Sequence, residues 1–187
     1  NCSHNFLKFI EKRISGEPLQ YILGEWSFMG FDFKVGRGVL IPRDDTEVVV
    51  NLCIDFLKNI TDKKTVDLCS GSGAIAVALD KISGAKVTAV EIDETAFSYL
   101  ETNVKENNSS VKPVMADALE ICETFADGAL DLIVSNPPYI KSADIETLQK
   151  EVRLEPRLAL DGGEDGYDFY REIVSRWSRK LKKGGAL

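Results

Sequence analysis

From residue 65 onwards, two kinds of hydrophobic pattern alternate along the chain. Short, nearly continuous apolar runs, typical of buried strands, are separated by segments in which apolar residues recur at helical spacing. The predicted strands cover residues 65–68, 86–90, 111–115 and 130–134, and the predicted helices cover 74–82, 95–107 and a short turn at 118–122. This alternation predicts an α/β fold of the Rossmann-like type, with a doubly wound, mostly parallel sheet and right-handed crossovers.

The part of the chain before residue 65 has a different pattern. Apolar residues between Phe6 and Ile14 fall on one face of a short helix, which Gly16-Glu17-Pro18 ends. Between Glu25 and Val35, aromatic and polar residues alternate around a glycine, which predicts a β-hairpin. A helix over residues 46–59 is expected to be capped by Asp44 or Asp45 and to bury the face formed by Val48, Val49, Leu52 and Phe56.

Near the end of the chain, a helix is predicted over residues 167–181, and Gly184-Gly185 is expected to start a strand at 186–187. A doubly wound sheet normally continues beyond such a strand, and the first helix resembles the tail of a larger element. We therefore expect residues to be missing at both ends. The predicted domains are residues 1–43, with the first helix, a linker and the hairpin, and residues 44–187, with the α/β part.

Composition narrows the classes of function. Of the 187 residues, 44% are hydrophobic and 28% charged, and no apolar run approaches the length of a membrane span, so we expect a globular protein outside the membrane. The net charge of -7 disfavours tight, sequence-independent nucleic-acid binding and fits a protein or small-molecule substrate better. A group of basic residues is interpreted as a solvated helix end. These are Arg176, Arg179, Lys180, Lys182 and Lys183.

The cysteines Cys2, Cys53, Cys69 and Cys122 are scattered, and His4 is the only histidine. This spacing makes a zinc site improbable, and His4 is a poor candidate for a general base. We interpret the thiols as reduced. The sequence shows neither a signal peptide nor a lipidation motif, which favours a cytoplasmic location.

A glycine-rich loop, Cys69-Ser70-Gly71-Ser72-Gly73, joins the strand at 65–68 to its helix. Glycines let such a turn approach a ligand closely, and the next helix presents free N–H groups. The loop has neither the G-x-G-x-x-G pattern nor a Walker lysine, which disfavours phosphate binding. Asp67 on the strand would repel a pyrophosphate but suits a cationic methionyl group. We therefore favour S-adenosylmethionine as the ligand.

Acidic residues follow the next two predicted strands. Glu91 ends the second strand, where doubly wound folds place an acid that takes both ribose hydroxyls, and we favour it over Asp93 for this role. Asp117, just past the third strand, either accepts from an adenine amine or caps the short helix after it. Because the carboxyl ends of parallel strands share one edge, the loop and these acids should lie together.

Asn136-Pro137-Pro138-Tyr139 follows the fourth predicted strand at the same edge. Proline fixes φ and pushes the preceding residue to extended geometry, so the Asn136 side chain and the Pro137 carbonyl form a rigid pair of acceptors. Such acceptors match the two N–H donors of an amide or exocyclic amine, which indicates methylation of a nitrogen with Asn136 and Pro137 as catalytic residues. The alternative interpretation is an ordinary strand-to-helix turn.

Two nearby side chains have more than one interpretation. Tyr139 either stacks against a flat substrate amide or covers the end of the sheet as ordinary packing. Arg43 either pairs with a carboxylate of the cofactor or the substrate, or forms an ion pair with Asp44, Asp45 or Glu47.

Together these segments resemble the peptide chain release factor glutamine N5-methyltransferases over nearly the whole chain. The tetrapeptide at 136–139 also occurs in adenine-N6 DNA methyltransferases, and its combination with the other segments is far more specific. Cys69 stands where many family loops have glycine, which is tolerable if its φ is negative, and Asp44 stands where many have proline. The segments that carry the resemblance are Gly16-Glu17-Pro18-Leu19-Gln20-Tyr21, Leu40-Ile41-Pro42-Arg43, Asp45-Thr46-Glu47, Asp67 to Gly73, Asn136 to Ile140, Glu155-Pro156-Arg157-Leu158-Ala159-Leu160 and Gly162-Gly163-Glu164-Asp165-Gly166.

The resemblance implies a class I methyltransferase in which residues 1–43 are the remnant of a helical substrate-docking domain. It implies S-adenosylmethionine bound by the loop at 69–73, Glu91, Asp117, Ala118 and Asn136. It also implies a substrate glutamine held by Asn136, Pro137, Pro138 and Tyr139. The implied partner is a peptide chain release factor, whose Gly-Gly-Gln glutamine receives the methyl group. We expect a monomer without a metal.

The expected mechanism is an in-line displacement at the sulfonium methyl by the glutamine amide nitrogen. Positioning outranks acid–base chemistry, since near-attack geometry can contribute ~7–11 kcal/mol. Acceptors from Asn136 and Pro137 would orient the nitrogen and stabilise the positive charge that develops on it. Two alternatives stay open: an adenine-N6 nucleic acid methyltransferase, in which a flipped base stacks on Tyr139, and a cofactor-binding module without activity.

Overall fold

The computed structural model describes residues 2–187, and side chains from Phe6 onwards. The predictions for Cys2 and His4 concern side chains outside this part. At the centre is a parallel sheet of five strands in the order β5-β4-β3-β6-β7. The strands are β3 (Lys64–Leu68), β4 (Lys86–Glu91), β5 (Lys112–Met115), β6 (Leu130–Ser135) and β7 (Leu181–Ala186). The predicted doubly wound α/β fold is thus confirmed.

The strand order reverses between β3 and β6. The chain passes from β3 outwards to β4 and β5, and then returns to place β6 on the other side of β3. The loops that follow β3 and β6 therefore leave the sheet in opposite directions and open a crevice at its carboxyl edge, where sheets of this type bind ligands.

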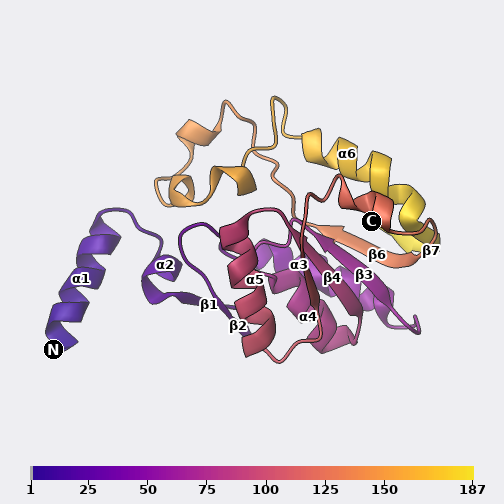
Figure 1. Cartoon of the computed structure of the whole chain (residues 1–187). Helices are drawn as coiled ribbons and strands as arrows, with labels where there is room; N and C mark the ends of the chain where they lie inside the picture. Colours follow the sequence, from indigo (N-terminus) through magenta and orange to yellow (C-terminus); the bar gives the residue numbers. More distant parts are fainter. Residues whose placement is uncertain (1) are drawn as a thin grey trace.

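Helices cover both faces of the sheet (Figure 1). One face carries α3 (Asp44–Leu57), α4 (Ala74–Ser83) and α5 (Glu94–Glu106). The other carries α6 (Asp168–Trp177) and the short 3₁₀ helix η1 (Ile121–Thr124). Side chains alternate along a strand, so Val66 and Leu68 of β3 face α6, whereas Thr65 and Asp67 face the opposite layer. This alternation decides which residues of β3 can reach a ligand.

The N-terminal part packs onto this sandwich. It comprises α1 (Cys2–Ile14), α2 (Leu19–Leu23) and the predicted hairpin, β1 (Glu25–Phe28) with β2 (Phe31–Lys34). Phe28 and Phe33 are buried in the same core as α3 and α4, and the Asn103 side chain of α5 bonds the backbone N–H and carbonyl of Lys34. The hairpin therefore shares its core with the α/β part, and the division into domains at residue 43 stays a prediction.

Two predictions for α3 are wrong. The helix begins at Asp44, so Asp44 and Asp45 lie in its first turn, and Arg43 at the N-cap makes no side-chain capping bond. Three of the four residues of its predicted core face are exposed, Val48 at 62%, Val49 at 42% and Leu52 at 65%, whereas Phe56 is partly buried against the core. The buried residues are instead Val50, Cys53 and Leu57. The sequence of α3 carries two interleaved apolar stripes, and helical periodicity does not tell which of them meets the sheet.

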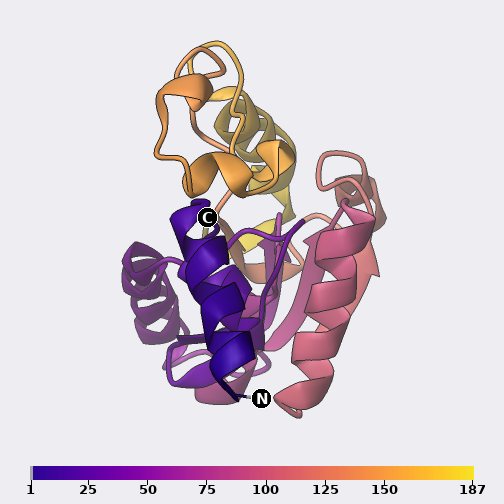
Figure 2. The same ribbon diagram turned by 90° about the vertical axis from the view of Figure 1, so that its left-hand side faces the viewer.

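The C-terminal boundaries also differ from those predicted. Helix α6 ends at Trp177, a 3₁₀ turn η5 (Ser178–Lys180) follows, and β7 already begins at Leu181, so that Gly184 and Gly185 lie within the strand. Between β6 and α6 the chain forms the short 3₁₀ helices η2 (Ile145–Thr147), η3 (Val152–Leu154) and η4 (Arg157–Ala159). Figure 2 shows this segment (orange) above the C-terminal end of α1. In the described part of the chain, no helix combines the length and apolarity needed to cross a membrane.

Candidate active site

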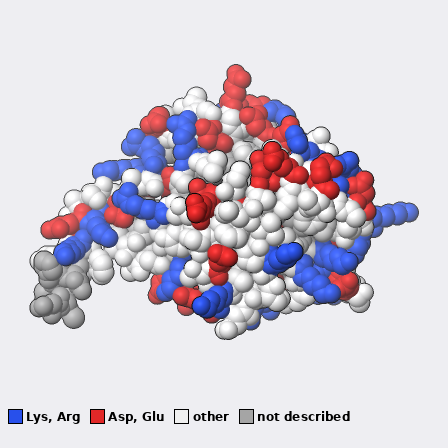
Figure 3. All heavy atoms as spheres, viewed as in Figure 1, with Lys and Arg blue, Asp and Glu red and all other residues white. Residues whose placement is uncertain are grey.

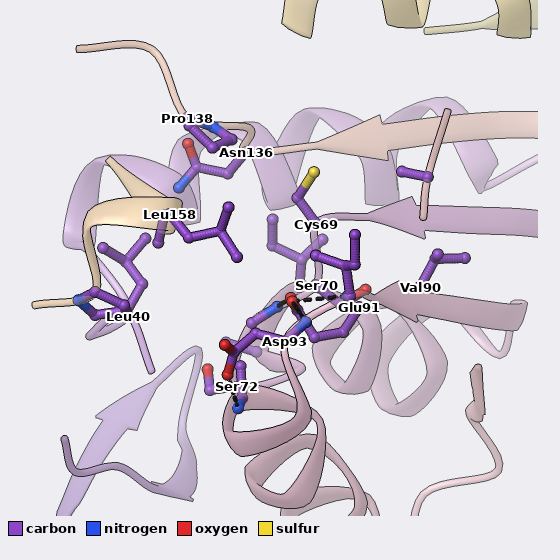
Figure 4. A pocket seen from close by; sticks show the side chains of 18 of the residues that line it. Leu40, Cys69, Ser70, Ser72, Val90, Glu91, Asp93, Asn136, Pro138 and Leu158 are labelled. Atoms are coloured by element: carbon purple, nitrogen blue, oxygen red, sulfur yellow. Dashed lines mark hydrogen bonds between the residues drawn. The ribbon is translucent and has the colours of Figure 1, made fainter. Parts of the chain in front are cut away.

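A pocket of about 320 Å³ opens at the carboxyl edge of the sheet, in the crevice between β3 and β6 (Figure 4). Most of the residues predicted from the sequence to bind a cofactor or substrate line it. They are Arg43, Cys69, Ser70, Gly71, Ser72, Glu91, Asp117, Ala118, Asn136 and Pro138. Leu40 and Leu158 come from segments far apart in the sequence and lie on the same side of the pocket (Figure 4). The structure thus brings the predicted residues together.

The glycine-rich loop turns sharply away from β3. The N–H of Ser70 donates to the carbonyl of Val90 at 3.0 Å, and the N–H of Gly73 donates to the carbonyl of Ser70 at 2.8 Å. Gly71 has a φ of 54° and Gly73 a φ of 80°. Cys69 also has a positive φ, 57°, so the condition under which we expected a cysteine to be tolerated is not met. Position 69 requires the left-handed conformation that glycine adopts freely, at a cost to any other residue.

The residues at either end of this loop, Cys69 and Gly73, have roles different from those expected. Gly73 does not line the pocket; an added Cβ there would lie 2.4 Å from Cδ1 of Leu100, so this glycine allows close packing of α5. The thiol of Cys69 does line the pocket. Burial raises its pKa to about 12, so the thiol stays protonated at neutral pH and is a poor nucleophile.

Glu91 ends β4, as predicted, and its carboxylate organises the loop. Oε2 accepts from the N–H of Gly71 at 2.8 Å, and Oε1 accepts from the N–H groups of Ile92 and Asp93, also at 2.8 Å. A carboxylate offers about four acceptor positions, and three are thus occupied. One position is left for a ligand on the pocket side, fewer than the two that binding both ribose hydroxyls would use.

Asp67 does not line the pocket, although we predicted that it binds the cofactor. Its side chain is fully buried and faces the α3 and α4 layer, and neither carboxylate oxygen has a hydrogen-bond partner of normal geometry among the described residues. Burial raises its pKa to about 8, with a smaller contribution from the charge of Glu91. At neutral pH Asp67 is therefore mostly protonated and carries little charge towards a cationic methionyl group.

Asp93 and Asp117 both line the pocket and both also terminate local structure. Oδ1 of Asp93 caps α5 by accepting from the N–H groups of Thr95 and Ala96 at 2.9 Å. Glu91 is therefore the acid at the end of β4. Oδ1 of Asp117 accepts from the N–H of Leu119 at 2.7 Å and starts the turn that leads into η1. Asp117 is thus not the N-cap of η1, which is Glu120, and both its turn-forming bond and its place in the pocket leave the predicted contact with a ligand open.

Asn136 lies at the junction of two pockets. Besides the first, it lines a second opening of about 600 Å³, which Tyr139 also lines. Among the described residues, no donor occupies the Asn136 side chain or the Pro137 carbonyl, and of these two residues Asn136 lines the pockets. Pro137 itself is buried and lines neither pocket. The Asn136 side chain is thus placed to meet a ligand, whereas the role of the Pro137 carbonyl stays a prediction.

The second pocket contains two aromatic side chains that the sequence did not single out. Trp26 of β1 and Tyr170 of α6 provide walls beside Tyr139, and Asp44 and Asp45, considered above as helix caps, provide carboxylates. These residues come from elements distant in sequence, and an aromatic on a helix or hairpin gives no local sign of facing a pocket.

The segment after η4 packs against the end of the Asn136-Pro137-Pro138-Tyr139 segment. The N–H of Ile140 donates to the carbonyl of Leu160 at 2.9 Å, and the N–H of Gly162 donates to the carbonyl of Ile140 at 2.8 Å. An added Cβ at Gly162 would lie 2.6 Å from Cα of Tyr139, and one at Gly166 would lie 2.5 Å from the Tyr139 carbonyl oxygen. Two glycines therefore let the backbones touch.

Arg43 lines both pockets, and its ion-pair partner is not one of the acids that we considered beside it. It pairs with Glu155, 112 residues further along the chain. Glu155 is a functional candidate that we did not predict; the signal available was a charged residue directly before a proline in a segment that carries the resemblance. Tyr21, in another of these segments, donates its hydroxyl to the carbonyl of Val39 at 2.5 Å.

Comparison with known proteins gives consistent results. The family model described as "Methyltransferase small domain" matches residues 43–157. The chain is 39% identical to the release factor glutamine methyltransferase of Thermodesulfovibrio yellowstonii, over 99% of this chain and 67% of that protein. It is 46% identical to the release factor glutamine methyltransferase of Geobacter sulfurreducens, over 95% of this chain and 62% of that protein. The chain thus spans less than the full length of the curated relatives that it matches.

Solved structures show the same fold at low sequence identity. A methyltransferase from Pyrococcus furiosus is 23% identical with a TM-score of 0.59, over 99% of this chain and 75% of that chain. The catalytic domain of hMettl16, solved in complex with a 3′UTR hairpin, is 18% identical with a TM-score of 0.66, over 87% of this chain and 64% of that chain. At this identity the likeness concerns the fold alone.

Proposed function

Because this chain belongs to the release factor glutamine methyltransferase family, we propose that it transfers a methyl group from S-adenosylmethionine to the side-chain amide nitrogen, N5, of a glutamine in a peptide chain release factor. The glutamine is that of the Gly-Gly-Gln motif. The observation that carries the proposal is the position of Asn136, which borders both the pocket at the sheet edge and the opening beside Tyr139.

The first pocket fits S-adenosylmethionine. Val90, Ile92 and Phe169 offer apolar surface for the adenine, and Glu91 and Asp117 offer acceptors for hydroxyl and amine groups. The loop of residues 69–74 offers a close backbone approach. When bound there, the cofactor supplies an electrophilic methyl group on a positively charged sulfur.

The second pocket receives the substrate glutamine. The Asn136 side-chain oxygen and the Pro137 carbonyl accept from the two N–H groups of its amide and so orient the nitrogen towards the first pocket. These acceptors also interact more strongly with the amide as it gains positive charge, which stabilises the transition state more than the ground state. Tyr139 and Trp26 supply flat surfaces beside the amide.

The test is methyl transfer by an Asn136→Ala variant. The protein is incubated with labelled S-adenosylmethionine and a release factor, and the label is located by peptide mass spectrometry. We expect wild type to label the glutamine, and the variant to lose nearly all transfer while its cofactor affinity, measured by calorimetry, changes only a few-fold. Asn51→Ala, on the exposed side of α3, is the matched control and should keep full activity. Strong transfer by Asn136→Ala would exclude the orienting role.

A duplex oligonucleotide in the same assay tests the alternative substrate, an adenine amine. The basic residues near the C-terminus lend that alternative little support, because most are paired with acids: Arg176 with Glu172, Arg179 with Glu123, Lys180 with Asp127, and Lys182 with Asp131. Acidic and basic side chains are interspersed over the face seen in Figure 3. Label on the nucleic acid and none on the glutamine would overturn the proposal.

A further inference from the structure

Glu155 is a carboxylate buried at the border of the active site. Its side chain is 2% exposed. Oε2 accepts from the backbone N–H of Ile41 at 2.9 Å, and Oε1 pairs with Nη2 of Arg43. A buried charge is tolerated when partners of this kind satisfy it, and losing one of them is costly. Glu155, Ile41 and Arg43 therefore behave as one unit.

This unit joins two segments, far apart in the sequence, that line the first pocket. Residues 40–43, which include both partners of Glu155, line one part of it, and the residues directly after Glu155, namely Pro156, Leu158 and Ala159, line another. The second set of lining residues belongs to a long segment whose regular structure is limited to short 3₁₀ helices. Such a segment has little internal stiffness, so its distance from the first set depends on contacts like that of Glu155.

Arg43 is the member of the unit that reaches ligands. It lines both pockets, as Asn136 does, and its side chain is 38% exposed. A guanidinium has five N–H donors, and among the described residues Glu155 is the acceptor that its side chain engages. An arginine side chain loses much conformational entropy when it is ordered. Pairing with a fixed, buried carboxylate orders it before a ligand arrives.

We propose that Glu155 is a positioning residue for methyl transfer: it holds the guanidinium of Arg43 at the junction of the two pockets, where the remaining N–H groups meet a carboxylate or carbonyl oxygen of the cofactor or the peptide. Glu155 itself touches neither ligand. The inference rests on the proposed function, because it assigns the two pockets to those ligands. A small displacement of a positioning group can lower a rate about 100-fold, so the effect is measurable.

The same segment provides a matched control. Glu151 also pairs with an arginine of the N-terminal part, Arg13, at 2.8 Å, but it is 36% exposed and lines neither pocket. Glu155→Gln keeps an oxygen for the N–H of Ile41 and turns a donor towards Arg43. Glu155→Asp keeps the charge on a shorter side chain. Arg43→Lys keeps a positive charge beside the buried carboxylate but removes the planar guanidinium with its paired N–H donors.

The experiment measures kcat and KM with a release factor, and separately the affinities for S-adenosylhomocysteine and a Gly-Gly-Gln peptide by calorimetry. We expect Glu155→Gln to lower kcat/KM and at least one affinity tenfold or more, Glu155→Asp to recover part of the loss, and Glu151→Gln to stay within twofold of wild type. Arg43→Lys should resemble Glu155→Gln. Circular dichroism and thermal unfolding give the folded fraction of each variant.

Two results would overturn the positioning role. One is a Glu155→Gln variant with ligand affinities and kcat/KM equal to those of Glu151→Gln. The other is a loss of activity that only follows the loss of folded protein, with Glu155→Asp and Arg43→Lys both fully active. The binding measurements need no turnover, so a wild-type protein that fails to methylate a release factor would refute the proposed function and still leave this comparison decisive.

Discussion

The backbone N–H of Gly71 donates to the carboxylate of Glu91 at 2.8 Å, which ties the loop after β3 to the end of β4. One acid thus both shapes the glycine-rich loop and faces the pocket. Glu91→Gln replaces one oxygen by an amide group that must face an N–H donor of Gly71, Ile92 or Asp93. We expect at least a tenfold loss of affinity for S-adenosylmethionine, measured by calorimetry. Glu94→Gln, in the first turn of α5, is the control and should bind normally.

The left-handed conformation of Cys69 predicts a stability difference between two small substitutions. Both Cys69→Gly and Cys69→Ala remove the thiol, but glycine adopts a φ of 57° without the penalty that alanine has. We expect Cys69→Gly to be more stable than Cys69→Ala by about 1 kcal/mol in chemical denaturation. Equal stability of the two variants would mean that the loop adopts a negative φ at this position in solution.

Burial of Asp67 predicts how stability depends on pH. Its pKa is raised to about 8 in the folded protein, against about 3.9 in an unfolded chain. Below about pH 4 both states are protonated. Between the two pKa values the folded state binds more protons than the unfolded state, so rising pH lowers the free energy of unfolding. Above about pH 8 this free energy no longer falls with pH through Asp67.

The Asp67→Asn variant lacks this titration. The difference in free energy of unfolding, variant minus wild type, should therefore increase as the pH rises from about 5 to about 8, by up to about 1.4 kcal/mol per pH unit. Above about pH 8 this difference should become constant. Urea unfolding at several pH values measures it. A difference that is the same at all pH values would show that Asp67 titrates in its ordinary range.

The two apolar stripes of α3 predict opposite results for two leucines. Leu57 is fully buried, whereas Leu52 is 65% exposed. We expect Leu57→Ala to lower the free energy of unfolding by about 2–5 kcal/mol and Leu52→Ala to change it by less than about 0.5 kcal/mol. If Leu52→Ala were the more damaging change, the face predicted from the sequence would be the buried one after all.

The sheet and its ligand edge were predictable because they follow from local patterns. Apolar runs place β3, β4, β5 and β6, and the carboxyl ends of parallel strands must meet. That geometry brought the glycine-rich loop, Glu91 and Asn136 to one pocket. The direction of a strand side chain follows from its neighbours by alternation, and the apolar residues Val66 and Leu68 already implied that Asp67 points to the opposite layer.

What could not be predicted depends on contacts between distant segments. The pairing of Arg43 with Glu155 spans 112 residues, and the nearer acids Asp44, Asp45 and Glu47 were equally plausible partners by sequence. The buried stripe of α3 likewise depends on how the helix is rotated against the sheet. The positive φ of Cys69 lies in a loop that is bonded to β4, and the cysteine itself gave no sign of it; the only sign was that many family loops have glycine there.

Gly162 sets the spacing between two stretches of backbone behind the tetrapeptide. Because an added Cβ would lie 2.6 Å from Cα of Tyr139, the two stretches of backbone pack too closely to leave room for a side chain at position 162. Pro137 and Pro138 make the front stretch too stiff to bend around an obstacle. A methyl group at position 162 would therefore displace the whole stretch that begins at Asn136, although Gly162 itself lines neither pocket.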